Sequence, residues 1–176
     1  MCNANLFKMQ STSHLQKLLT IYLRLYMAMV RPHLEFASPV WNPYLAQDIN
    51  RLEAVQRHAT KRIPSIRHLP YSERLTSLGM DTLKLRRPAA DLADTHKIIN
   101  HRTNNNSEHL FKLHPSNTRG HIYKVRKQHS SHDFRKHFFT LRVAEAWNRL
   151  PASVVSCRST ASFKTFMLPE IRQHYT

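Results

Sequence analysis

The chain has 176 residues, and its 27 Lys and Arg against 11 Asp and Glu give a formal net charge of +16. Its two glycines are too few and too far apart for a glycine-rich phosphate loop, and its two cysteines exclude a disulfide framework and a four-cysteine zinc site. The charge indicates an anionic partner, and aromatic residues within the basic stretches favour a folded nucleic-acid-binding surface over a membrane-binding one.

The first third of the chain predicts two helices with an irregular segment between them. Apolar residues recur at helical spacing from Leu15 to Met29, which indicates a largely buried helix that ends at Pro32 or restarts there. Residues 32–44 contain three prolines and cannot form one regular helix. A second helix is expected over residues 45–63, where apolar residues line one face and Pro64 ends the pattern.

Two more helices are expected before residue 100. Ser72 is placed to cap a short helix that Gly79 closes. Asp81 is placed to cap a longer helix that runs to about Asn100, and Pro88 is expected either to kink this helix or to restart it.

The last part of the chain begins with a polar linker or long loop over residues 101–120. A short strand is expected at residues 121–127, and then a helix that starts at Ser131 or Asp133 and runs to about Arg149. A final short helix is expected over residues 161–167, behind Ser159. These elements predict an all-α fold that leaves room for one short β element.

The acidic residues do not form a catalytic set. Asp48, Asp81 and Asp133 are best explained as helix caps, and Asp91 and Asp94 as part of a solvated helix face rather than a metal site. No two carboxylates are adjacent in the sequence, whereas two-metal phosphoryl transfer needs convergent carboxylates. We therefore assign no catalytic residue.

Histidines are abundant but do not indicate zinc. His129, His132 and His137 lie within nine residues, yet neighbouring lysines and arginines would repel a dication. They are interpreted as surface residues of a basic segment. Trp41 and Trp147 could stack on bases, but burial in a core is favoured for both.

Basic residues follow helix faces. Arg51 and Arg62 share a face of the second helix. Arg135, Arg142 and Arg149 are seven apart and lie near one face of the later helix, where they could bind phosphates. The alternative is a solvated face on which Arg142 pairs with Glu145.

Several blocks of the sequence resemble, in the same order and spacing, the C-terminal part of a non-LTR (LINE-type, Jockey-like) retrotransposon reverse transcriptase. The blocks are residues 25–37 (LYMAMVRPHLEFA), 40–45 (VWNPYL), 49–61 (INRLEAVQRHATK), 71–75 (YSERL) with 78–79 (LG), 135–139 (RKHFF), 142–143 (RV), 147–151 (WNRLP) and 162–164 (SFK). The similarity as a whole covers about residues 12–168.

The resemblance implies a helical thumb-like array followed by a smaller helical segment. Residues 12–100 would form the thumb-like module, residues 101–120 a linker or long loop, and residues 121–176 a basic C-terminal helical segment. In this family the region follows the polymerase palm, whose catalytic aspartates have no counterpart in this sequence. The chain on its own is therefore expected not to be an enzyme and to need no cofactor, although the full-length family enzyme would need Mg²⁺.

The expected function is nucleic-acid binding by a thumb-like module that lacks the palm. The expected partners are RNA, DNA or an RNA–DNA hybrid, held through phosphates, and the palm and fingers of a reverse transcriptase; no membrane contact is expected. The expected location is intracellular, cytoplasmic or nuclear. The alternatives are a protein-interaction module and a non-functional translated remnant of a mobile element. The residues expected to bind nucleic acid are Arg51, Arg57, Lys61, Arg62, Arg135 and Arg142.

Overall fold

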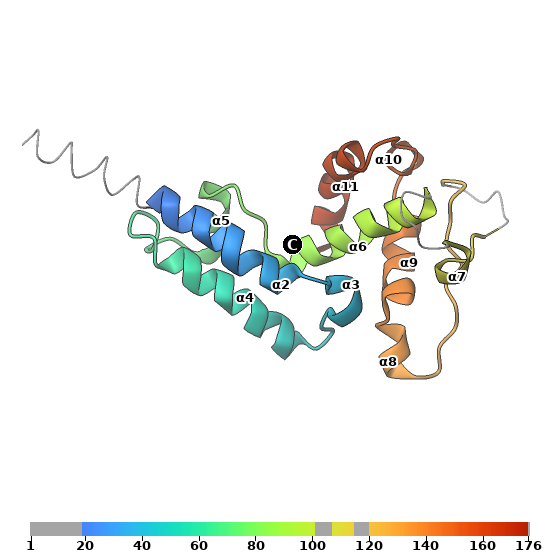
Figure 1. The fold of residues 1–176 in the computed structure, drawn as a ribbon, viewed down its shortest axis with the longest axis horizontal. Coiled ribbons are helices and arrows are strands. Elements are labelled where there is room, and N and C mark those ends of the chain that lie inside the picture. The colour runs from blue at the N-terminus through green and yellow to red at the C-terminus, as the bar shows by residue number, and fades with distance from the viewer. Residues whose placement is uncertain (1–18, 101–106, 115–119, 176) are drawn as a thin grey trace, which may run out of the picture. The chain divides into compact units, whose positions relative to one another are not determined.

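The structure is a computed structural model that describes residues 19–100, 107–114 and 120–175. Its regular elements in this part of the chain are helices, and the one piece of β structure is an isolated antiparallel bridge between Leu113 and Val125. This confirms the predicted all-α fold (Figure 1). The strand expected at residues 121–127 is reduced to that bridge, because each partner contributes a single residue to it.

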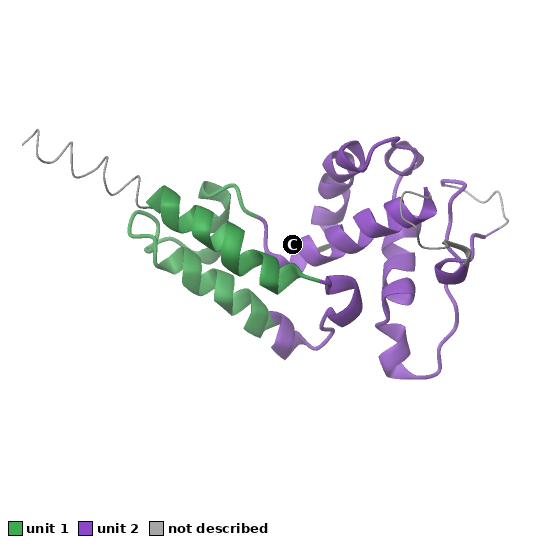
Figure 2. Ribbon diagram, in the orientation of Figure 1, with its two compact units in different colours: residues 1–36, 50–80 green, residues 37–49, 81–176 purple. Residues whose placement is uncertain are grey.

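The chain divides into two compact units, which Figure 2 colours separately. Unit 1 consists of residues 1–36 and 50–80, and unit 2 of residues 37–49 and 81–176. We predicted that residues 12–100 form one module. Instead α6 (Leu83–Ile99) packs against α9 (Phe139–Arg149) and α11 (Thr160–Tyr175), so it belongs with the C-terminal helices.

Unit 1 begins with a helix that changes its winding. Residues 19–25 are α-helical, the π-helical turn η1 (Tyr26–Val30) follows, and α2 (Arg31–Glu35) continues with Pro32 in its first turn. The π-helical turn, in which the Arg31 amide donates to the Tyr26 carbonyl, lies directly before Pro32, and the chain stays helical through this proline. The remaining parts of unit 1 are residues 50–61 of α4 (Ala46–Lys61) and α5 (Tyr71–Ser77).

The core of the described part of unit 1 is small. Tyr26, Leu75 and Met80 are buried together, with partly buried apolar side chains around them. Gly79 has φ of 61°, a left-handed conformation that favours glycine, and it follows α5 as predicted. Ser72 is not the cap of α5, because the helix already begins at Tyr71 and Pro70 is its N-cap residue.

Unit 2 begins with α3 (Ser38–Trp41) and the first four residues of α4, after a left-handed Ala37 with φ of 51°. As predicted, residues 32–44 do not form one helix. The long α6 includes Pro88 without a break. Its N-cap is Thr82, whose hydroxyl accepts the Leu85 amide at 3.2 Å, so the predicted cap at Asp81 was wrong.

The C-terminal helices differ from the sequence prediction in their boundaries. The helix predicted from residue 131 or 133 to Arg149 is divided into α8 (Asp133–Lys136) and α9. The last helix runs to Tyr175 rather than Met167, and Ser159 caps it by accepting the Ser162 amide at 3.0 Å. Two single turns, α7 (Ser107–Leu110) and α10 (Ala152–Val155), complete the described elements.

One cluster of fifteen buried residues holds unit 2 together. Trp147 and Phe163 lie inside it with no exposed surface, and the Trp147 indole donates to the Tyr123 carbonyl at 2.8 Å. Val125, a partner in the bridge, and Phe111, two residues before the other partner, also belong to it. Residues 107–114 of the expected linker are therefore partly built into a core.

Candidate nucleic-acid interface

The solvent-facing side of α4 and of the residue that follows it is basic. At 100° per residue, Arg51, His58, Lys61 and Arg62 fall on one side, and all four are exposed. The opposite side carries Glu53, Gln56 and Thr60, all buried. We call these four exposed residues the α4 basic face; they include three of the six predicted binding residues.

A buried hydrogen-bond network fixes which side of α4 faces outward. Tyr26 Oη donates to Gln56 Oε1 at 3.1 Å, and Gln56 Nε2 donates to Tyr71 Oη at 3.1 Å. Tyr71 in turn donates to the Glu53 carboxylate. Burial and the nearby Glu53 raise the pKa of Tyr71 well above its ordinary value, so its hydroxyl keeps its proton and remains a donor.

Arg57, the fourth predicted residue on this helix, has a second role. Its guanidinium carbon lies 5.1 Å from the centre of the Tyr71 ring, and the guanidinium carbon of Arg74 lies 5.6 Å from the same ring centre. Arg57 remains exposed, whereas Arg74 is buried and donates to the Leu69 carbonyl at 3.2 Å. A cation over an aromatic face gains electrostatic energy, so Arg57 borders the α4 basic face while also contacting Tyr71.

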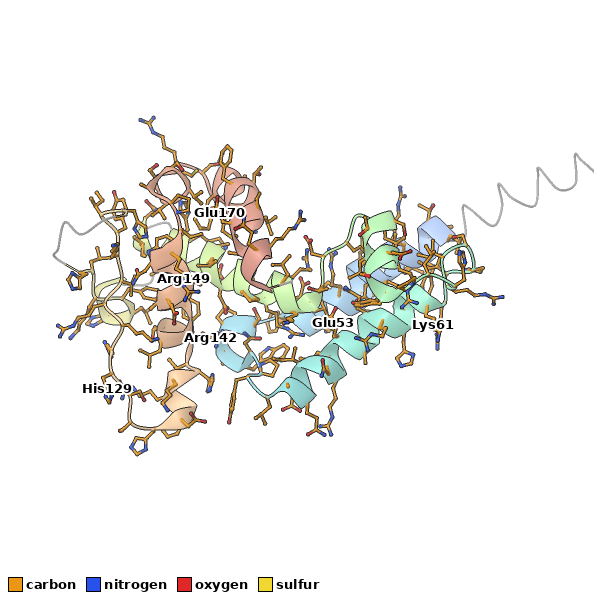
Figure 3. The ribbon with its side chains drawn as sticks, turned by 180° about the vertical axis from the view of Figure 1, so that it is seen from behind. Glu53, Lys61, His129, Arg142, Arg149 and Glu170 are labelled. Carbon is orange, nitrogen blue, oxygen red and sulfur yellow. The ribbon has the colours of Figure 1, made fainter. Side chains whose placement is uncertain are left out.

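The described part of unit 1 has a positive local charge. It contains eight Arg or Lys and three Glu. One of these carboxylates, Glu53, is buried on the inner side of α4, and its label in Figure 3 lies on the same helix as that of Lys61. The solvent side of α4 is thus an anion-attracting surface on a rigid helix.

Arg142 is not on a phosphate-facing surface, and the prediction for this residue was wrong. Its Nε donates to Asp91 Oδ2 at 2.9 Å and its Nη2 to Asp91 Oδ1 at 3.1 Å. Nη1 donates to the His137 carbonyl, and Nη2 also donates to the carbonyls of Ser38 and Pro39, each at 3.1 Å. All three nitrogens are engaged and only 17% of the side chain is exposed, so the guanidinium joins elements within unit 2.

Asp91 was also misplaced by sequence reasoning. Its side chain is only 4% exposed, so it does not lie on a solvated helix face. Burial raises the pKa of its carboxyl group, while Arg142 acts in the opposite direction. The sequence did not distinguish it from Asp94, three residues further along α6; only the fold buries Asp91 while leaving Asp94 partly exposed.

The other two arginines of the predicted row lie in different surroundings. Arg135 is exposed on the short α8, before the chain bends at residues 137–138. Arg149 pairs with Glu145, which Lys127 also contacts at 3.2 Å. Figure 3 labels Arg142 and Arg149 on α9. The three arginines therefore do not form a common phosphate-binding row. Of the three, only Arg135 remains a candidate binding residue, beside those on α4.

The histidine-rich segment borders a groove in unit 2 of about 580 Å³. Lys127, His129, Lys136 and His137 contribute to its lining. Lys136 pairs with Asp133 at 3.4 Å, so part of the positive charge is neutralised nearby. Within the described residues, no three His, Cys, Asp or Glu side chains come together in a way that could hold a metal ion.

The two tryptophans lie in contrasting environments. Trp147 is in the core, as favoured from the sequence, but Trp41 is 39% exposed. Among the described helices, none is both long and apolar enough to cross a membrane. No protein-family model, no curated protein and no solved structure matches the chain.

Proposed function

We propose that the chain is a thumb-like module derived from a non-LTR retrotransposon reverse transcriptase, and that it binds nucleic acid through backbone phosphates. The proposal rests on the resemblance of the sequence blocks and on one structural observation, the α4 basic face. A row of cations along a rigid helix suits the phosphates of a duplex, which set position without reading sequence. Arg51, Arg57, Lys61 and Arg62 are the principal binding residues, with Arg135 on α8 as an additional one.

A salt titration tests this proposal. Each phosphate contact releases about 0.9 counterion, so the affinity for an RNA–DNA hybrid should fall linearly with salt on a log–log plot. Lys61→Gln and Arg62→Gln should each weaken binding and reduce the slope by about one. Lys164→Gln, which removes an exposed cation from α11, is the matched control and should change neither value. Absence of binding at low salt, or a flat plot, would overturn the proposal.

The chain alone should not synthesise DNA, because no residue matches the family's catalytic aspartates. We expect no primer extension on a primed RNA template with Mg²⁺ or Mn²⁺. Incorporation of nucleotides by the purified chain would contradict this part of the proposal.

A second candidate function is protein interaction, and an apolar stripe in unit 1 favours it. Ile21, Leu25 and Met29 are all exposed at intervals of four residues. The wider π-helical turn keeps Met29 in line with the other two, where an α-helical turn would rotate it further round. Association that persists at high salt without nucleic acid would support this function, since apolar packing survives screening.

A further inference from the structure

We propose that Trp41 and Tyr44, in unit 2, form a stacking platform for unpaired bases of single-stranded nucleic acid. This inference rests on the proposed function, because its ligand is also a nucleic acid. It adds a second kind of contact, made to the flat faces of bases rather than to phosphates. Such stacking tolerates any sequence, because every base has a π-face.

The first observation is the exposure of two large aromatic side chains three residues apart. Trp41 is 39% exposed at the end of α3, and Tyr44 is 49% exposed in the loop before α4. Exposed aromatic surface loses the free energy that burial would give. Trp147, the other tryptophan, is completely buried, whereas Trp41 keeps part of its ring in contact with solvent.

The second observation is that a side chain from another helix or its flank supports each ring. The guanidinium carbon of Arg87, on α6, lies 6.0 Å from the centre of the Trp41 ring, and Arg87 itself is buried. Tyr44 stacks on His137, with ring centres 4.0 Å apart and planes only 6° from parallel. Both rings are thus held in defined orientations while part of their surface remains open to solvent.

The third observation is that the segment carrying Trp41 is pinned to the core. Arg142 donates to the carbonyls of Ser38 and Pro39, the first two residues of α3, and Ser38 is buried. Arg142 is itself held by Asp91. A platform fixed in this way loses little conformational entropy when a ligand binds, which favours affinity.

The fourth observation is the set of polar and charged side chains around the loop between α3 and α4. The lining of a cavity of about 190 Å³ includes Asn42 and Pro43, from the loop between α3 and α4, Lys84 and Arg87 from α6, and the Asp91–Arg142 pair. The Asn42 amide offers donors and an acceptor to the edge of a base, and the exposed Lys84 is suited to a phosphate. Aromatic faces next to positive charge favour a flat anionic ligand such as a nucleotide chain over an apolar peptide.

Tryptophan fluorescence of the full chain tests the platform. The chain has two tryptophans and Trp147 is fully buried, so an added ligand should quench Trp41 selectively. We expect quenching by a hexa-adenylate RNA and little or none by an abasic hexamer with the same number of phosphates. In Trp41→Phe, the remaining emission should not respond to either hexamer. Equal quenching by the two hexamers in the wild-type chain would overturn the proposal.

Affinity of a labelled hexamer, followed by fluorescence anisotropy, supplies a second readout. Trp41→Leu and Tyr44→Leu should each weaken binding on the order of tenfold without changing the salt dependence, because stacking releases no counterions. Phe166→Leu, which removes an exposed aromatic ring from α11, should leave the affinity unchanged. Circular dichroism of each variant identifies any loss of helical structure.

The two proposals fail in different ways. If Trp41→Leu and Tyr44→Leu both keep wild-type affinity for the hexamer, the platform is wrong, whatever the hybrid titration gives. If Lys61→Gln and Arg62→Gln leave hybrid binding and its salt slope unchanged while the platform variants lose the hexamer, the platform stands and the phosphate contacts on α4 are wrong.

Discussion

Arg142 and Asp91 show how a single ion pair can organise unit 2. They are 51 positions apart in the sequence, and both are largely withdrawn from solvent. Removing one partner of a buried pair leaves the other charge uncompensated, which is more costly than losing a surface contact. We therefore expect Arg142→Gln to lower the free energy of unfolding by about 3 kcal/mol, measured by chemical denaturation.

The pair of Arg149 with Glu145 is the matched control for Arg142. Its side chains are more than half exposed, and exposed pairs contribute at most about 1 kcal/mol. Arg149→Gln should therefore change stability much less than Arg142→Gln. Equal effects of the two substitutions would contradict the structural role assigned to Arg142.

His121 makes the stability of unit 2 depend on pH. The ring is buried, its Nε2 lies 3.1 Å from the Trp147 carbonyl, and it packs edge-on against the Trp147 indole. Burial lowers the pKa of His121, an effect that the Trp147 carbonyl partly opposes and Lys124 reinforces. The unfolded chain therefore binds this proton more readily, and stability is lost as the pH falls below about 6.5.

Substitution of His121 isolates this effect from the other histidines. His121→Gln keeps a donor but does not titrate, so its unfolding free energy should change less between pH 7 and pH 5 than that of the wild-type chain. Denaturant titrations at several pH values measure the difference. Identical pH profiles would show that His121 is not the group responsible.

At the scale of elements, the network beneath α4 determines how the basic face is presented. Tyr71→Phe removes the hydroxyl that donates to the buried Glu53 and accepts from Gln56. Weakening a buried polar network costs about 1–3 kcal/mol. We expect a loss of stability in that range, and a smaller change for Tyr44→Phe, whose side chain is half exposed. Thermal and denaturant unfolding of both variants provide the comparison.

Sequence periodicity predicted α4 well but misjudged the helices that contain proline. Apolar spacing and Pro64 placed α4 within two residues at each end, because a surface helix shows its buried face in its sequence. Pro88 and Pro169 both lie inside continuous helices. Buried residues beyond each proline, such as Leu92 and Ile171, pack into the core and outweigh the lost hydrogen bond, which local rules cannot anticipate.

In the candidate interface, the sequence predicted the exposed residues of α4 but not the tertiary contacts of Arg142. Exposure of Arg51, Lys61 and Arg62 follows from helical spacing alone. The burial of Arg142 does not, since its partner Asp91 lies on a distant helix and only the tertiary fold brings them together. The turn at His137 was missed for a similar reason, because this residue contacts Arg142 through its carbonyl and Tyr44 through its ring.

At the scale of the whole molecule, the two units should differ in local stability. Among the described residues, three buried ones form the cluster at the centre of unit 1, whereas fifteen form that of unit 2. Less buried apolar surface gives a smaller free energy of opening. Hydrogen exchange should therefore be faster for the amides of residues 50–61 than for those in the interiors of α6 and α9. Uniform protection across both groups would mean that the chain opens as one cooperative unit.

The division of the chain at residues 36, 49 and 80 also bears on how the protein emerges from the ribosome. Every residue of unit 1 has been synthesised once position 80 is reached, so this unit can fold early. Residues 37–49 are made before that point, but the helices they join come later. At about 5–20 residues per second, residues 81–176 take roughly 5 to 20 seconds. During that interval residues 37–49, which include Trp41, lack the helices of unit 2 that they pack against. An exposed segment of this kind is a natural substrate for chaperones.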